Sequence, residues 1–190
     1  MGTNRRVLIL ADSDNTFLAA QSFNRRLDWQ KLRDYLADPR EGRELIEMVI
    51  YVGLPPARDR FEEQRKTKEK FIYWAKSNGF LVVQKEGKTK GDDYETNIDI
   101  VMAMDAIELA LEVRPDIVVL VTGDSDFAYL AEKLRRRGMR VEVASVEQSL
   151  GNDLKVAASS IVDLIGVFDS FNPQNNQQTF HRIGHTNVFD

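Results

Sequence analysis

The feature that most constrains this chain is a series of short runs rich in Ile, Val and Leu, separated by longer polar segments. Such runs lie at residues 7–11, 45–52, 80–83, 116–121 and 141–146, with residues 161–165 as an optional sixth. Strands this apolar are covered on both faces, as in parallel sheets. Because helical patterns fall between the runs, the sequence predicts alternating βα units and an open sheet covered on both sides.

The segments between the runs are expected to form helices at residues 28–37, 57–77, 95–112, 126–137 and 152–158. Asp28 is a good N-cap for the first, and Asn78-Gly79 a good end for the second. The expected fold is a three-layer α/β sandwich with a mostly parallel sheet of five or six strands. The domain is expected to span residues 5–168, and the Asn- and Gln-rich residues 169–190 to be a flexible tail.

The composition excludes several kinds of chemistry. The chain has no cysteine, which excludes thiol nucleophiles, disulfides and Cys-ligated zinc. Its two histidines, His181 and His185, lie in the expected tail, so a Ser-His-Asp triad has little support. Any catalysis would then fall to carboxylates, hydroxyls or lysines, and oxygen ligands of this kind suit Mg²⁺ or Mn²⁺.

The apolar runs are also too short to cross a membrane. None approaches the roughly 20 residues that a membrane-spanning helix needs. The first run, residues 7–11, is too short for the core of a signal peptide, and Asp12 and Asp14 follow it. We therefore expect a cytoplasmic protein with no membrane partner.

Aspartates follow two of the expected strands. Asp12 ends the first strand, and Asp124 and Asp126 follow the strand at 116–121. The carboxyl ends of parallel strands form the ligand-binding edge of such folds. Capping of the next helix would explain one carboxylate, but not three at one edge. The sequence therefore predicts an acidic site that a divalent cation would stabilise.

Asp99 is an independent candidate for the same site. Asp105, Glu108 and Glu112 are spaced three and four apart and form one solvated stripe of their helix. Asp99 lies roughly 145° from that stripe, on the face expected to pack. Because no lysine or arginine occurs between residues 91 and 113, its charge needs another partner. A shared metal ion, a distant arginine or the helix N-terminus would each provide one.

Positive charge is concentrated between residues 58 and 90, a segment that contains ten Lys and Arg but only five Asp and Glu. A mixed charge run of this kind is either a solvated helix face or a phosphate-contacting surface beside the acidic site. In the second case the candidate nucleic-acid-binding residues are Arg58, Arg65, Lys85, Lys88 and Lys90.

Taken together, these motifs are similar to those of a known family. The matching segments are Asp12 with Asn15, Asn97-Ile98-Asp99, residues 122–127 (Thr-Gly-Asp-Ser-Asp-Phe), Ser145 and residues 161–164. Over about residues 5–168 the chain resembles the NYN domain proteins of the LabA/DUF88 type, which have a PIN-like nuclease fold. The resemblance implies a Rossmann-like sheet, a Mg²⁺ or Mn²⁺ cofactor and hydrolysis of RNA phosphodiester bonds, in single-stranded or structured RNA.

The resemblance also implies roles for individual residues. The acidic metal-site and catalytic residues would be Asp12, Asp99, Asp124 and Asp126. Asn15 would orient the first loop, and Thr122 and Ser145 would support the site. Many relatives have Lys-Gly before the helix aspartate, whereas this chain has Thr96-Asn97. Lys85, Lys88 or Lys90 would then have to supply that positive charge.

Two other functions stay open at this level. Some proteins of this group are regulators, so the same fold is consistent with a non-catalytic protein that binds RNA, a protein partner or a second copy of itself. In addition, residues 12–16 (Asp-Ser-Asp-Asn-Thr) match the Asp-x-Asp-x-Thr motif of phosphatases of the haloacid dehalogenase type. The late acidic pair of that motif fits poorly, because Phe127 and Ala128 stand where its second acid is usually found.

Overall fold

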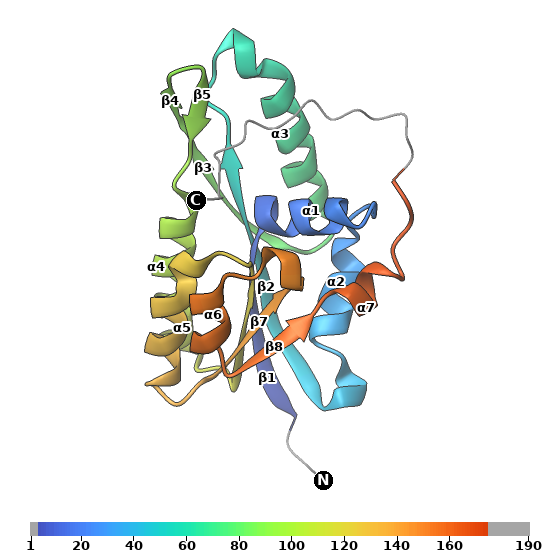
Figure 1. Ribbon diagram of the computed structural model, residues 1–190, viewed down its shortest axis with the longest axis vertical. Helices are drawn as coiled ribbons and strands as arrows, with labels where there is room; N and C mark the ends of the chain where they lie inside the picture. Colours follow the sequence, from blue (N-terminus) through green and yellow to red (C-terminus); the bar gives the residue numbers. More distant parts are fainter. Residues whose placement is uncertain (1–3, 175–190) are drawn as a thin grey trace.

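The protein is built on one six-stranded, all-parallel sheet, described here for residues 4–174 of a computed structural model (Figure 1). The strand order is β3-β2-β1-β6-β7-β8, with the first strand in the centre. Each of the six strands in the sheet matches one of the expected apolar runs: β1 (Arg5–Asp12), β2 (Arg43–Leu54), β3 (Leu81–Glu86), β6 (Ile117–Val121), β7 (Arg140–Ser145) and β8 (Ser160–Asp163). The α/β prediction, including the sixth strand, is confirmed.

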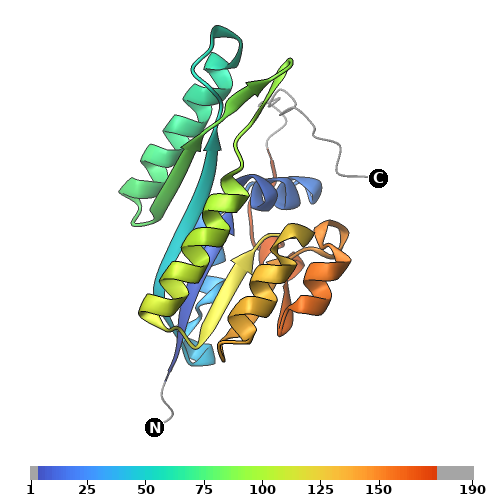
Figure 2. The ribbon, with the colours of Figure 1, turned by 90° about the vertical axis from the view of Figure 1, so that its left-hand side faces the viewer.

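Helices cover both faces of this sheet and produce two separate cores (Figure 2). One core lies under α1 (Ser13–Ser22), α2 (Trp29–Leu36), α3 (Glu62–Ser77) and α7 (Ile165–Phe168). The other lies under α4 (Ile98–Val113), α5 (Ala128–Arg135) and α6 (Asn152–Ala157). Short 3₁₀ turns complete the chain: η1 (Pro39–Glu41), η2 (Asp59–Phe61), η3 (Ser125–Phe127) and η4 (Glu147–Ser149).

Two elements depart from the sequence-based expectation. Helix α1 was not expected because the residues it buries are Ser13, Thr16, Ala19 and Ala20, which give no large apolar periodicity. The hairpin of β4 (Lys88–Lys90) and β5 (Asp93–Glu95) was also missed, because its strands have only three residues each and are mostly charged.

The C-terminal part of the described chain packs against the domain. Phe171 is buried in the core under α2 and α7, and the backbone carbonyl of Asn172 accepts a hydrogen bond from the backbone N–H of Arg26. Packing therefore continues past residue 168, where the domain was expected to end. Residues 175–190 of the expected tail, with His181 and His185, lie outside the described residues. No helix within residues 4–174 is long and apolar enough to cross a membrane.

The register of the sheet determines which way the end of β1 faces. Leu8 and Leu10 belong to the core under α4 and α5, and Asp12 follows them in the same alternation. Asp12 is in register with Tyr51 of β2, which belongs to that core as well. The carboxylate of Asp12 therefore projects toward the α4 layer, at the carboxyl edge of the sheet.

Candidate metal centre

Asp12 has two structural functions at this edge. It ends β1, and its Oδ1 caps α1 by accepting hydrogen bonds from the backbone N–H groups of Asp14 (3.0 Å) and Asn15 (3.1 Å). Capping by an aspartate at this position is common. The second oxygen, Oδ2, accepts no hydrogen bond from the described residues, so half of this carboxylate remains open to a further ligand.

The electrostatic environment of Asp12 disfavours its negative charge. Burial raises its pKa from 3.8 to about 6, and the charges of Asp14 and Asp124 act in the same direction. The backbone N–H donors of Asn15 and Asp14 oppose this shift and are outweighed. The interaction with Asp124 also shows that the first and fourth apolar runs bring their aspartates into one electrostatic neighbourhood.

The loop after β6 is tied directly to the loop after β1. The side-chain oxygen of Asn15 accepts a hydrogen bond from the backbone N–H of Gly123 (2.9 Å), and the Thr122 hydroxyl accepts one from the backbone N–H of Asp124 (3.2 Å). Asp124 in turn caps η3 through Oδ1, which accepts from the backbone N–H of Asp126 (2.9 Å). As in Asp12, Oδ2 accepts no hydrogen bond from residues 4–174.

Gly123 allows this loop to pass close to the next one. A Cβ at this position would lie 1.8 Å from the carbonyl oxygen of Ser149 and 2.9 Å from the hydroxyl of Ser145. The carbonyl of Gly123 also accepts a hydrogen bond from the backbone N–H of Gly151 (2.8 Å). Any side chain at residue 123 would push the Asp124 loop away from the sheet edge. Buried Ser145 lies behind this loop, at the end of β7.

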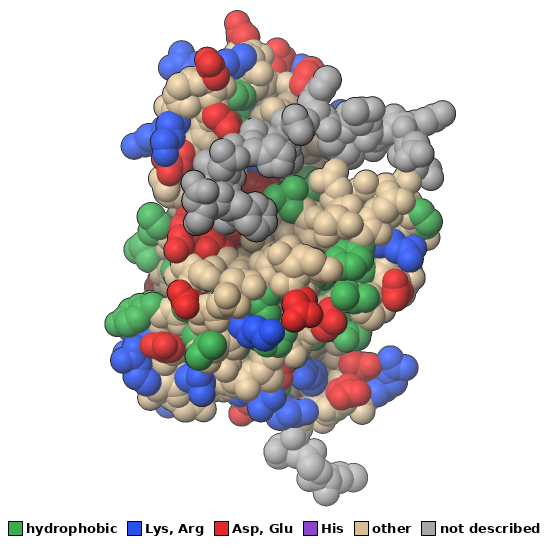
Figure 3. Space-filling model, in the orientation of Figure 1, with side chains coloured by type: hydrophobic (Ala, Val, Ile, Leu, Met, Phe, Trp, Pro, Cys, Tyr) green, Lys and Arg blue, Asp and Glu red, His purple; other side chains and the backbone are tan. Residues whose placement is uncertain are grey.

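The other two predicted acids lie less deeply in the structure. Asp99 is half-buried in the first turn of α4, and Asp126 is exposed on η3. Among the described residues, no three Asp, Glu or His side chains converge closely enough to hold a metal ion as they stand. Acidic side chains do gather near the N-terminal end of α4 (Figure 3).

One expectation about α4 is wrong. Glu108 and Glu112 are exposed, but Asp105 is half-buried rather than part of a solvated stripe. It lies beside Tyr51, whose pKa is raised by burial and further by the Asp105 carboxylate. The Tyr51 hydroxyl is fully buried and has no hydrogen-bond partner of good geometry among residues 4–174, although Asp105 is near enough to influence it.

The structure also shows a cation at this edge that the sequence did not reveal. The ammonium group of Lys68, on α3, lies 2.8 Å from both carboxylate oxygens of Asp14 and 2.7 Å from the carbonyl of Gly53. Its side chain is only 13% exposed. Tyr94 of the hairpin lies nearby: burial, and then the charges of Asp14 and Asp93, raise its pKa to about 12. No local signal links these residues, because Lys68 is 54 positions from Asp14.

The predicted basic residues differ in how far their charges are already neutralised. Arg65 forms ion pairs with Glu69 and Glu86, and Lys90 pairs with Glu95. Lys85 donates to the carbonyl of Asn97, immediately before α4. Exposed Arg58 and Lys88 have no side-chain partner among the described residues.

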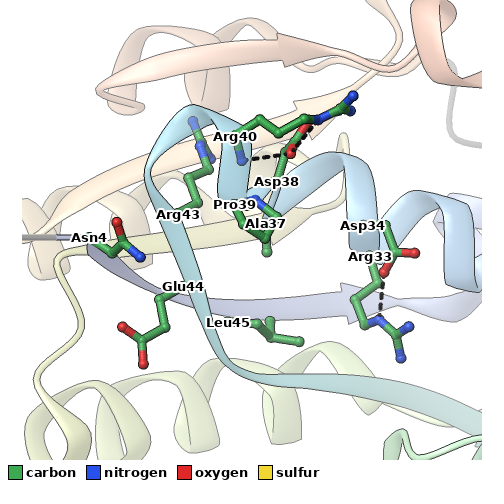
Figure 4. A pocket seen from close by; sticks show the side chains of 10 residues that line it. All are labelled: Asn4, Arg33, Asp34, Ala37, Asp38, Pro39, Arg40, Arg43, Glu44 and Leu45. Carbon is green, nitrogen blue, oxygen red and sulfur yellow. Dashed lines mark hydrogen bonds and ion pairs between the residues drawn. The ribbon is translucent and has the colours of Figure 1, made fainter.

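A hollow of about 530 Å³ lies away from these aspartates (Figure 4). It is lined by Arg33, Arg40 and Arg43 at the opposite edge of the sheet, where β2 begins. Each arginine is already paired, with Asp34, Asp38 and Glu142. This hollow therefore offers no uncompensated charge, and the candidate chemistry remains at the carboxyl edge.

The sequence matches the profile of the NYN domain over residues 6–165, which covers every element of the central sheet. The chain belongs to the NYN domain family. Its resemblance to that family, inferred above from the aspartate motifs, is thereby confirmed.

Two individual proteins resemble this NYN domain along most of its length. It is 27% identical over 166 residues to the Low amplitude and bright protein LabA of Synechococcus elongatus, covering 84% of this chain and 83% of that protein. The crystal structure of VPA0982, a protein of unknown function from Vibrio parahaemolyticus, superimposes with a TM-score of 0.69. That structure is 22% identical, with 88% of this chain and 98% of the other aligned, and it supports the fold alone.

Proposed function

We propose that this NYN domain is a metal-dependent ribonuclease whose active site is the acidic carboxyl edge of the sheet. The single observation that supports this best is Asp12: burial raises its pKa to about 6, and the charges of Asp14 and then Asp124 add to that rise. Carboxylates that destabilise one another in this way favour a bound cation. Membership of the NYN family supports hydrolysis of phosphodiester bonds as the proposed reaction.

The residues that would hold the ion are Asp12 and Asp124, with Asp99 and Asp126 completing the set. The donor chemistry fits, because all four offer hard carboxylate oxygens, and Oδ2 of both Asp12 and Asp124 accepts no hydrogen bond from the described residues. A divalent ion bound there supplies activation of water and stabilisation of charge on the phosphoryl oxygens. Mg²⁺ and Mn²⁺ both suit such a site.

The remaining residues would position the site and the substrate. Asn15 holds the two loops together through its bond to Gly123, while Thr122 fixes the start of the Asp124 loop. Exposed Arg58 and Lys88 would contact RNA phosphates, since neither charge is neutralised by the described residues. Arg65, Lys85 and Lys90 would contribute less, because other groups already engage them.

The proposal is tested by incubating the purified full chain with labelled single-stranded and stem-loop RNAs, in Mg²⁺, in Mn²⁺ or in EDTA. We expect cleavage only with metal, and its loss by a factor of about 100 or more in Asp124→Asn. Asp163→Asn is the matched control, because Asp163 also lies at the end of a parallel strand, and its Oδ1 also accepts a hydrogen bond from a backbone N–H two residues on, that of Ile165. Equal cleavage by Asp124→Asn, or cleavage that survives EDTA, would refute the assignment.

The second candidate is a non-catalytic regulator, since the LabA-like group that this chain resembles includes regulators. It predicts that the chain binds the same RNAs but leaves them intact with either metal. A phosphatase of the haloacid dehalogenase type is less consistent with the structure. Its acid–base would be Asp14, and both oxygens of that carboxylate are bound by Lys68.

A further inference from the structure

The outer surface of α4 carries an apolar stripe that nothing in the described chain covers. Ile100 is 53% exposed, Met104 66% and Leu111 38%, with half-buried Ile107 between the last two. Their spacing of four, three and four residues is that of a seam between packed helices. Hydrophobic side chains line the margin of the molecule over α4 in Figure 3. Contiguous apolar surface of this kind marks an interaction site more often than scattered exposed residues do.

The neighbouring helix, α5, carries an exposed ridge made of one aromatic and two basic side chains. Tyr129 is 65% exposed, and the cationic groups of Lys133 and Arg136 lie 5.9 and 5.5 Å from the centre of its ring. The spacing of these three residues is again four and three. The aromatic ring and the aliphatic stems of the two cations thus form one amphipathic ridge.

The charges beside the two ridges are complementary. Helix α4 has no Lys or Arg, and its exposed Glu108 and Glu112 lie along one side of the apolar stripe. Residues 128–137, which include α5, hold one acidic and four basic residues. The α4 ridge is apolar and acidic, and the α5 ridge beside it is aromatic and basic. A second copy of the same face can therefore place its basic ridge on the acidic one, and its acidic ridge on the basic one.

We propose that this α4–α5 face is the interface of a two-fold symmetric homodimer. A two-fold axis running between the helices and along them would place α4 of one copy on α5 of its partner, and the reverse. The acidic ridge then meets the basic ridge twice, and the apolar stripe packs against the ring of Tyr129. An axis perpendicular to the helices would instead place α4 on α4 and α5 on α5, bringing like charges together.

This arrangement has a consequence for the acidic edges of the two copies. Both α4 and α5 begin at the carboxyl edge of the sheet, where Asp99 opens α4 and Asp124 precedes α5 (Figure 2). Because the axis runs along the helices, both copies present this edge in the same direction. The two acidic edges therefore lie at the same end of the dimer, on either side of the axis. The dimer itself does not depend on any activity at those edges.

The test is the molar mass of the full chain in solution, measured by light scattering and sedimentation over a range of concentrations. The wild-type chain is expected to form a dimer that dissociates on dilution. Met104→Lys buries a positive charge at two symmetric places in the interface, each against the basic ridge of the other copy, and should weaken association by about a hundredfold or more. Tyr73→Lys is the matched control, because Tyr73 is 77% exposed on α3, on the opposite face of the sheet. Circular dichroism checks that each variant is folded.

Charge reversal then tests which ridges meet. Glu108→Lys with Glu112→Lys should weaken the dimer, and adding Lys133→Glu with Arg136→Glu should restore it, because opposite charges again face each other. A wild-type chain that stays monomeric at every concentration would overturn the proposal. Binding of a different protein to the α4 stripe, without self-association of this chain, would also overturn it. The interface is refuted if Met104→Lys leaves the dimer intact, or if the fourfold charge-reversal variant fails to restore it.

Discussion

Replacing Asp12 with Asn should stabilise the metal-free protein at neutral pH while removing its metal site. The pKa of Asp12 is raised from 3.8 to about 6, chiefly because burial disfavours the charged carboxylate. At about 1.4 kcal/mol per pKa unit, ionised Asp12 costs the fold roughly 2–3 kcal/mol. An asparagine carries no charge, yet its side-chain oxygen can still cap α1.

The sign of the pH dependence follows from the raised pKa. A carboxyl group with a raised folded-state pKa contributes its stability below the unfolded pKa of 3.8 and loses it as the pH rises through about 6. The difference in the free energy of unfolding between Asp12→Asn and the wild type should therefore be small near pH 4 and reach its full size above pH 7. Saturating Mg²⁺ should narrow it again, because the ion binds the folded wild-type protein alone.

The assay is urea denaturation of the full chain between pH 4 and 8, in EDTA and in Mg²⁺. Asp163→Asn is the matched control, since Asp163 is an exposed aspartate that ends β8 at the same edge, and it should change stability by less than about 0.5 kcal/mol at every pH. If Asp12→Asn is less stable than the wild type in EDTA at pH 7.5, or if the difference does not change with pH, the electrostatic reasoning is refuted.

Two further substitutions test the packing that supports the site. Gly123→Ala places a Cβ 1.8 Å from the backbone oxygen of Ser149, so it should cost about 2–4 kcal/mol in thermal unfolding; an unchanged melting temperature would contradict that contact. Arg43→Met leaves largely buried Glu142 with Arg140 as its remaining partner, and should cost about 2–3 kcal/mol at pH 7. Burial alone would raise the pKa of Glu142, but hydrogen bonds from Arg43 and then Arg140 lower it. The extra stability of the wild type over Arg43→Met should therefore be lost as the pH falls below about 4.5. A stability difference that stays constant as the pH is lowered would contradict this explanation.

The sheet could be predicted from the sequence because its strands are buried on both faces. Residues 117–121 are entirely buried, and the strand at residues 7–11 is buried as a continuous run. Such runs leave a clear apolar signal in the chain. Helix α1 left no comparable signal, because Ser13 and Thr16 occupy buried positions where large apolar residues would be expected.

The candidate site could be predicted only where its residues follow strands. Asp12 follows one apolar run directly and Asp124 lies three residues past another, and parallel topology brings the ends of such runs to one edge. The pairing of Lys68 with Asp14 depends on how α3 lies over the first loop, and a local pattern does not specify that. The burial of Asp105 was missed for a related reason, since helical spacing does not show that Tyr51 lies under that turn of α4.

The most direct test of the central claim is a crystal structure of this protein soaked in Mn²⁺, with anomalous scattering used to locate the ion. We expect anomalous density within coordination distance of Oδ2 of Asp12 and of a carboxylate oxygen of Asp124 or Asp99. That density should disappear in crystals of Asp12→Asn. Density at another place, or an acidic edge that stays empty while Asp12 and Asp124 serve only as helix caps, would contradict the claim.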